Sequence, residues 1–308
     1  MGGTGGRYSG ARSDKVLEQI NQEKQKERER LDGQVDDLIR ELLARYNDRD
    51  TEKVSERLDT IRENLGEAAD LDTILFGGSV AKHTAVDGLS DVDALVILDK
   101  QSIGADSPQD LIDSFHRLLS QSLPRSDIES VSKGRLAVTV TYQDGQEIQL
   151  LPALRSRNTV RIAASDGRTW QDTKPRGFQS ALTRENRRMN QSLVPAIKLT
   201  KSVFADFPPQ KQLRSYHIET LAVDAAKNYK GPKNPKALLL QILEHSSRRV
   251  LRPIADVTGQ SRTADEYLGS ANSDQRRNIS QTLEGTVRRL MAATTIAQWR
   301  AVLDRVRG

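Results

Sequence analysis

The first part of the chain is polar, and its few apolar residues recur at helical spacing. Val35, Leu38 and Leu42 are three or four residues apart, which places them on one side of a helix. The pattern predicts two long polar helices, at about residues 14–47 and 50–65. The first of them would extend for about 50 Å, so we expect it to brace more than one lobe of the protein.

From residue 71 the pattern changes to short β-rich runs. They predict strands at 72–76, 93–98, 135–142 and 147–151, and an amphipathic helix at 109–123. Asp144-Gly145 is a turn signal, so the last two strands should pair antiparallel. After about residue 175 the chain is almost all helical, with helices expected at 182–204, 215–229, 235–251 and from 274 onward. The predicted fold class is therefore α+β: a mixed, mostly antiparallel sheet with helices, arranged as a meander with one inserted helix, followed by a helical C-terminal lobe.

These changes in pattern divide the chain into four parts. We expect residues 1–12 to form a flexible glycine-rich N-terminus, and residues 13–66 to form the polar helices that brace the lobes. Residues 67–170 form the core that carries the chemistry, and residues 171–308 form the helical lobe. Polar residues cluster between 159 and 177, which is where we expect a loop to join the two lobes.

Composition excludes several classes of protein. The 308 residues include no cysteine, which rules out a disulfide framework, a cysteine-ligated zinc site and a cysteine nucleophile. No run approaches the roughly 20 apolar residues that span a bilayer, and no signal peptide is visible, so we expect a cytoplasmic protein that does not bind membranes. The net charge of +5 suits anionic partners such as nucleotides but is no strong signal for duplex nucleic acid.

The most informative segment is a glycine-serine turn followed by two acids. Gly77, Gly78 and Ser79 come directly after a predicted strand, and such a turn lets backbone and hydroxyl groups approach a phosphate closely. Asp91 and Asp93 follow two residues apart at the start of the next strand, so both carboxylates lie on one face. Oxygen ligands beside a phosphate suit Mg²⁺ or Mn²⁺, and two such ions clamp the reacting oxygens in phosphoryl transfer. We therefore expect Asp91 and Asp93 to be metal ligands.

Two later helices carry further candidates. Lys198 and Lys201 are three residues apart and flank an apolar stripe, where they would hold a triphosphate or form a solvated face. Tyr216 falls opposite the apolar stripe of its helix, so it would stack on a base or be exposed without a role. His217 is expected to be structural, because this chemistry does not need an imidazole.

Together these segments resemble a known family. Gly-Gly-Ser followed by Asp-x-Asp is similar to the signature of the polymerase β-like nucleotidyltransferases, and the fuller pattern resembles the bacterial cGAS/DncV-like nucleotidyltransferases (CD-NTases). Residues 147–153 resemble the family's third-acid strand, residues 198–201 its triphosphate-binding helix, and Ser215 with Tyr216 the pair that contacts the nucleotide.

The resemblance implies a function. It implies a metal-dependent enzyme that joins NTPs into a cyclic di- or trinucleotide second messenger and releases pyrophosphate, in bacterial anti-phage (CBASS-type) signalling. The product would act on a separate effector, and activating or modifying proteins of the same operon would be partners. Two alternatives stay open: a nucleotidyltransferase that modifies RNA or a protein hydroxyl, and a nucleotide-binding protein with impaired turnover.

One position departs from the family pattern. Gln149 stands where the family has a third acid, and an amide is no base and a weak ligand of Mg²⁺. In a strand, Glu147 and Gln149 share a face, while Ile148 and Leu150 point to the core. Three interpretations are open: Glu147 reaches the metals from one step along the strand, the glutamine is an introduced change that traps substrate, or the protein binds nucleotide and turns it over poorly.

Overall fold

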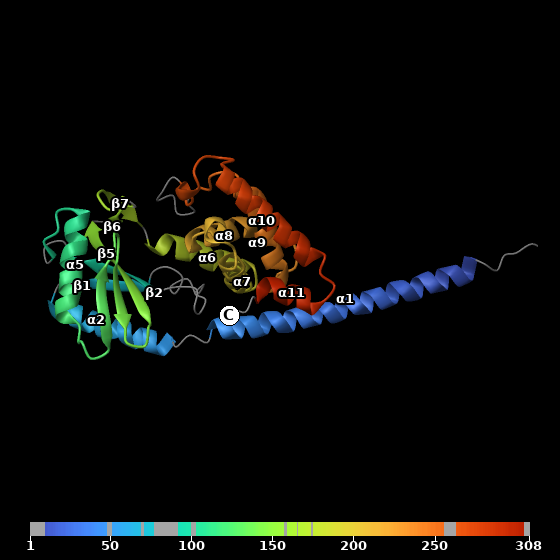
Figure 1. Ribbon diagram of the computed structural model, residues 1–308, viewed down its shortest axis with the longest axis horizontal. Helices are drawn as coiled ribbons and strands as arrows, with labels where there is room; N and C mark the ends of the chain where they lie inside the picture. The colour runs from blue at the N-terminus through green and yellow to red at the C-terminus, as the bar shows by residue number, and fades with distance from the viewer. Residues whose placement is uncertain are drawn as a thin grey trace, which may run out of the picture.

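The computed structural model describes residues 10–47, 51–68, 71–76, 92–99, 103–156, 159–164, 166–173, 175–255 and 263–304. They form a sheet lobe and a helical lobe, which lie side by side and are joined in sequence through β7 and α6 (Figure 1). The elements, in chain order, are α1 (Gly10–Asn47), α2 (Thr51–Ala68), β1 (Leu71–Phe76), β2 (Val92–Leu98), α5 (Pro108–Ser122), β3 (Ile128–Lys133), β4 (Val138–Tyr142), β5 (Glu147–Ser156), β6 (Thr159–Ala163), β7 (Trp170–Thr173), α6 (Pro175–Arg188), α7 (Leu193–Ala205), η1 (Pro209–Lys211), α8 (Ser215–Ala226), α9 (Pro235–Arg249), η2 (Glu266–Leu268), α10 (Asp274–Met291) and α11 (Ile296–Leu303).

The sheet has the strand order β1-β2-β5-β4-β3, with β6 beside β5 and β7 beside β6. All the neighbouring pairs are antiparallel except β2 and β5, which are parallel. The predicted mixed, mostly antiparallel sheet is confirmed. The predicted meander is right for the antiparallel pairs β1–β2 and β4–β5 but wrong between β2 and β4, because the chain crosses over through α5 and β5 returns beside β2.

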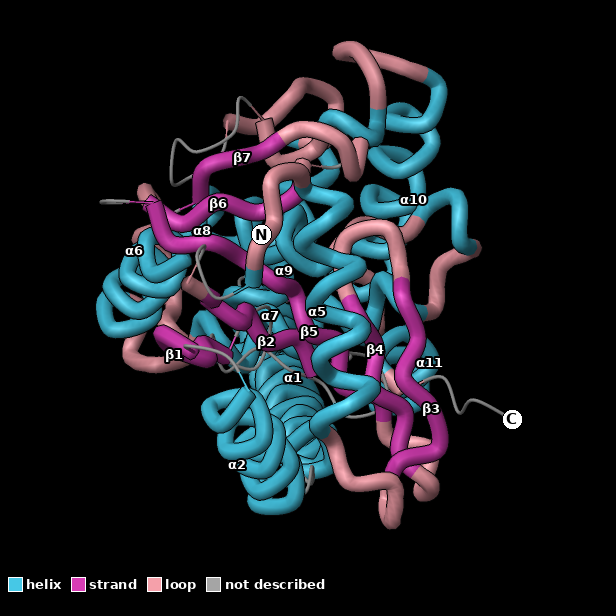
Figure 2. The backbone as a smooth tube through the Cα atoms, turned by 90° about the vertical axis from the view of Figure 1, so that its left-hand side faces the viewer, coloured by secondary structure: helices cyan, strands magenta, loops and turns pink. Residues whose placement is uncertain are grey.

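One face of the sheet carries the larger part of the core of this lobe. The helices α2 and α5 cover it, and α5 crosses in front of the strands in Figure 2. The sequence explains where α5 begins, because Ser107 and Asp110 form a capping box at its start. Its buried residues Ile112 and Phe115 are fully excluded from solvent. A smaller cluster, Leu95, Ile97, Ala153 and Val160, occupies the opposite face.

An arginine on α2 fastens that helix to the turn between β4 and β5. Arg57 is 6% exposed, and its guanidinium lies 3.7 Å from the centre of the Tyr142 ring. It also donates hydrogen bonds to Asp144, Gln146 and Asp127. Because each of these contacts joins parts of the chain that are far apart in sequence, the hydrophobic pattern does not predict them.

The two N-terminal helices pack on different lobes. The second half of α1 buries Val35, Leu38 and Leu42 in the core of the helical lobe, whereas α2 packs against α5 and β1. The first half of α1 extends beyond the helical lobe (Figure 1), and its apolar residues Leu17 and Ile20 are exposed. None of the helices in the described ranges is long and apolar enough to cross a membrane.

The predicted helix at 182–204 is two helices in the structure. The helix α6 ends at Arg188, and Asn190 and Gln191 take positive φ angles of 51° and 62°. The side chain of Asn186 then accepts a hydrogen bond at 3.0 Å from the backbone N–H of Val194, in the first turn of α7. The continuous prediction was wrong because asparagine tolerates the left-handed conformation, which a hydrophobic periodicity does not reveal. The helix expected from residue 274 likewise divides into α10 and α11.

Three strands were not predicted. The edge strand β3 is mostly exposed and rich in polar residues, so it lacks a strong apolar alternation. The hairpin of β6 and β7 falls in the polar stretch where a loop was expected between the lobes. Its turn is stabilised by Asp166, whose carboxylate accepts hydrogen bonds from the backbone of Arg168 and Thr169.

Candidate active site

The described backbone brings the two segments that flank the glycine-serine turn and the first aspartate to one edge of the sheet, the edge formed by the end of β1 and the starts of β2 and β5. Gly77, Gly78, Ser79 and Asp91 lie outside the described residues, between the end of β1 and the start of β2. Phe76 pairs with Ala94 in the antiparallel ladder, so the chain leaves β1 and enters β2 at the same edge. The amino end of β5 lies at this edge too, because β5 runs parallel to β2.

The register of β5 places the third-acid position beside the second aspartate of the motif. Asp93 of β2 is the parallel partner of Gln149, and Thr139 of β4 is its antiparallel partner on the other side. Glu147 and Gln149 are exposed and Ile148 is fully buried, which confirms the alternation predicted for this strand. Gln149 thus presents an amide, and Glu147 a carboxylate, on the face opposite the one that α2 and α5 cover.

These groups fit a divalent cation by their chemistry. Carboxylate oxygens are the side-chain ligands that Mg²⁺ prefers and an amide oxygen is a weaker one. The backbones of Asp93 and Gln149 are neighbours across one ladder step, about 4.8 Å apart in a sheet. No cluster of three or more His, Cys, Asp or Glu side chains suited to a metal occurs within the described part of the chain. Asp91, the remaining predicted ligand, lies outside that part.

The two lysines predicted to hold a triphosphate differ in their surroundings. Lys198 on α7 is half-buried, and burial lowers its pKa, an effect to which the positive charge of Lys201 adds. The ammonium of Lys201 donates to the Glu219 carboxylate on α8 at 2.8 Å, and both side chains are buried. Lys201 therefore belongs to the seam between two helices rather than to a solvated face.

The start of α8 carries the two predicted nucleotide contacts. Ser215 is exposed, as a group that binds a ligand at a surface must be. Tyr216 is half-buried, and its ring meets that of Phe178 on α6 edge to face, with the centroids 4.9 Å apart. The tyrosine is therefore held against α6 and is not a fully exposed surface residue.

A buried polar network holds the start of α8 from behind. The Nδ1 atom of His217 lies 2.9 Å from the Tyr267 hydroxyl, which also accepts a hydrogen bond from the backbone N–H of Arg214. Burial lowers the pKa of His217 to about 4, so the imidazole is neutral at neutral pH. Its Nε2 atom has no hydrogen-bond partner among the described residues and lies 3.8 Å from the Asp265 carboxylate, which pairs with Arg276.

Sequence reasoning missed Glu219, although a signal was present. Glu219 precedes Ala222 and Val223 by three and four residues, and both of these are fully buried. A charged residue on the apolar side of a helix needs a partner. That spacing therefore marks Glu219 as a paired carboxylate, but it does not identify Lys201 as the partner.

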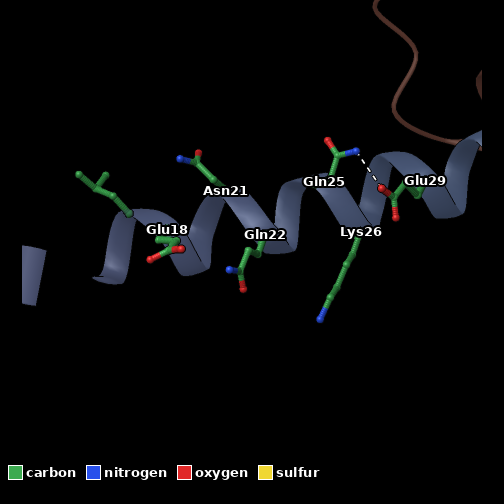
Figure 3. Close-up of a pocket in the computed structure, with 7 residues that line it drawn as sticks. Glu18, Asn21, Gln22, Gln25, Lys26 and Glu29 are labelled. Atoms are coloured by element: carbon green, nitrogen blue, oxygen red, sulfur yellow. Dashed lines mark hydrogen bonds between the residues drawn. The ribbon is translucent and has the colours of Figure 1, made fainter. Parts of the chain in front are cut away.

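The structure also contains a surface hollow that lies elsewhere. All the residues that line it, from Leu17 to Glu29, belong to α1 (Figure 3). Gln25 donates a hydrogen bond to Glu29 across one helical turn at 2.8 Å. A hollow formed by one helix lacks the converging groups of a catalytic pocket.

The fold and this sheet edge define a class of protein. A mixed sheet with Asp-x-Asp at the start of one strand, the third-acid position on its parallel neighbour and a helical lobe behind is the polymerase β-like nucleotidyltransferase fold. Residues 31–186, just over half of the chain, match the model of the Second Messenger Oligonucleotide or Dinucleotide Synthetase domain. The chain belongs to this family, and it is a nucleotidyltransferase of the cyclic oligonucleotide synthase class.

Solved structures share the fold at low sequence identity. CdnC of E. coli MS115-1 with ATP is 18% identical, with a TM-score of 0.66 over 82% of this chain and 91% of that one. The complex of the same protein with HORMA-deltaN is 17% identical, with a TM-score of 0.67 over 84% of this chain and 91% of that one. CdnG of Bradyrhizobium diazoefficiens with GTP is 16% identical, with a TM-score of 0.64 over 82% of this chain and 89% of that one. A search of curated protein sequences finds no significant match.

Proposed function

We propose that this enzyme joins NTPs into a cyclic di- or trinucleotide at the edge of the sheet where β1 ends and β2 and β5 begin. The observation that carries the proposal is the parallel register of Asp93 with Gln149, within the matched family domain. It aligns the Asp-x-Asp motif with the third-acid position, which is the arrangement that the chemistry needs.

The substrate's triphosphate is assigned to the glycine-serine turn and the helical lobe. Gly77, Gly78 and Ser79 would contact the phosphates, together with Lys198 and Lys201 on α7. Ser215 and Tyr216, at the start of α8, would contact the sugar and base. Fixed amide, hydroxyl and ammonium donors lower the barrier by orienting the phosphates and offsetting their charge.

Asp91 and Asp93 would hold two Mg²⁺ or Mn²⁺ ions. Bound there, the ions would neutralise the triphosphate and stabilise the oxygens at the reacting phosphorus. The ribose hydroxyl of a second nucleotide attacks the α-phosphorus, a new P–O bond forms, and the bond to the β-phosphate breaks as pyrophosphate leaves. The hydroxyl proton passes to Glu147 or to water, since the amide of Gln149 cannot accept it.

Assay of the purified protein with labelled NTPs and Mg²⁺ or Mn²⁺ tests the proposal. We expect pyrophosphate and a nuclease-resistant cyclic product, and no product from the Asp91→Ala/Asp93→Ala double variant. Absence of any product above that control, across all combinations of NTPs, would overturn it. Label transferred to added RNA or protein would favour the alternative acceptors instead.

Gln149 supports a second candidate, a nucleotide-binding protein with slow turnover. An amide at the third-acid position weakens both metal binding and proton removal. This candidate predicts NTP binding with little pyrophosphate release, which Gln149→Asp would raise because it restores an acid. Turnover by the unaltered protein at a rate that Gln149→Asp does not raise would contradict it.

The setting is proposed on the same basis. We place the enzyme in the cytoplasm, where NTPs are available, and in anti-phage signalling with a separate effector for the product. The CdnC complex with HORMA-deltaN supports an activating protein partner. Addition of proteins encoded beside this gene to the assay, and phage challenge of cells with and without it, would test these assignments.

A further inference from the structure

The Lys201–Glu219 pair is buried at the seam between α7 and α8. The two side chains are 4% and 0% exposed, and the ammonium and carboxylate are 2.8 Å apart. Both helices also carry proposed substrate contacts. Lys198 precedes Lys201 by one turn of α7, and Tyr216 precedes Glu219 by one turn of α8.

Burial makes each charge of the pair depend on the other. An ionised carboxylate or ammonium removed from water is strongly disfavoured unless it is paired, so Glu219 keeps Lys201 protonated and Lys201 keeps Glu219 ionised. Without the carboxylate, the buried ammonium of Lys201 would lose the negative charge that stabilises it in its present position.

Lys198 adds a second reason for a carboxylate here. Two ammonium groups one helical turn apart repel each other, and the charge of Lys201 helps to lower the pKa of Lys198. The negative charge of Glu219 offsets that repulsion. Glu219 accepts a hydrogen bond from the Lys201 ammonium, which fixes the position of this cation in the seam.

We propose that Glu219 is a positioning residue, which acts through Lys201 to fix a cation for the substrate triphosphate. This inference rests on the proposed function, because it takes the lysines as phosphate ligands. It adds to the proposed site a residue that does not touch the nucleotide. Glu219 sets the charge and direction of the Lys201 ammonium, and the two lysines contact the phosphates.

A purely structural pair is the competing explanation. Buried ion pairs can be replaced by apolar residues without loss of stability, so burial alone does not require a role toward substrate. The two explanations differ in NTP affinity. A structural pair affects folding, whereas a positioning residue affects NTP binding in protein that is fully folded.

The experiment is a double-mutant cycle in nucleotide binding. Dissociation constants for non-hydrolysable ATP and GTP analogues with Mg²⁺ are measured for wild type, Glu219→Gln, Lys201→Met and the double variant. Urea denaturation confirms that each is folded. We expect each single variant to bind at least tenfold more weakly, and Glu219→Gln to have no further effect once Lys201 is absent.

A matched control and a rescue variant complete the design. Glu185 on α6 is also buried and paired, with Arg188, so Glu185→Gln makes the same chemical change in an ion pair formed with an arginine of its own helix. It should leave NTP affinity unchanged. Glu219→Asp keeps the charge and should bind within about threefold of wild type, and in turnover assays Glu219→Gln should raise KM more than it lowers kcat.

The outcomes separate this inference from the proposed function. Wild-type affinity in folded Glu219→Gln, or single-variant effects that multiply in the double variant, would overturn the inference alone. If Glu219→Gln unfolds, a folded double variant that binds NTP as tightly as wild type would overturn the inference, and one that binds at least tenfold more weakly would support it. Failure of the wild type to bind either analogue would overturn both, and binding without turnover would overturn the synthase proposal alone.

Discussion

Arg276 provides a quantitative test of how the helical lobe is held together. Its side chain is fully buried and donates five hydrogen bonds, to the carboxylate and backbone carbonyl of Asp265, to the carbonyl of Val250 and twice to the carbonyl of Gly269. The guanidinium thus joins the end of α9, the segment around η2 and the start of α10. Replacement by methionine keeps much of the volume and removes every one of these bonds.

The expected loss follows from what remains behind. Asp265 keeps a hydrogen bond from the backbone N–H of Ile254 but loses its counterion while fully buried. Removal of one partner of a buried ion pair costs about 3–5 kcal/mol, and the carbonyls of Val250 and Gly269 also lose a donor. We therefore expect Arg276→Met to lower the free energy of unfolding of the helical lobe by at least about 3 kcal/mol.

The two tryptophans make the assay specific to a lobe. Trp299 lies in the core of the helical lobe and Trp170 packs against the core of the sheet lobe, so each single-tryptophan variant reports on one lobe in urea. The control is Arg277→Met, whose exposed pair with Asp274 is worth no more than about 1 kcal/mol. A loss below about 1 kcal/mol for Arg276→Met, or an equal loss for the control, would refute the reasoning.

Acidification should destabilise the helical lobe through His217. The pKa of His217 is about 4 in the folded protein, below its ordinary value of 6.5. As pH falls from 6.5 to 4, the imidazole therefore takes up a proton in the unfolded chain but not in the folded one. The unfolding free energy should drop by up to about 3 kcal/mol over that range, and urea melts of His217→Gln should lack this slope. Gln149→Asp should raise the rate of NTP turnover about tenfold or more; an unchanged rate in the labelled-NTP assay would mean that the third-acid position does not limit the reaction. Arg57→Ala should lower the stability of the sheet lobe by about 2 kcal/mol, detected at Trp170; an earlier transition at Trp299 instead would contradict the role assigned to this contact.

The parts of the site that depend on local periodicity were predictable. The alternation of Ile148 and Leu150 with Glu147 and Gln149 has a period of two, so the strand and its exposed face follow from the sequence. The helix α5 was also predictable from local sequence, because its apolar residues recur at helical spacing and its capping residues mark where it begins.

Contacts between distant elements were not predictable in this way. Lys201 and Glu219 are eighteen residues apart, and their meeting depends on how α7 and α8 pack. Sequence periodicity places each residue on a helix face but does not select the neighbouring helix. The same limit applies to the parallel pairing of β2 with β5, because a pattern of short strands does not specify their order in the sheet.

The parallel pairing of β2 with β5 has a consequence for biosynthesis. The ribosome completes β2 at Leu98, but the strand that lies beside it begins only at Glu147. Until then the nascent chain carries the Asp-x-Asp motif at the start of β2, and the side of β2 that will pair with β5 has no neighbouring strand. Pairing between strands so far apart in sequence forms late in folding. Premature termination before β5 would therefore release a fragment that has the two aspartates but not the strand that completes the site.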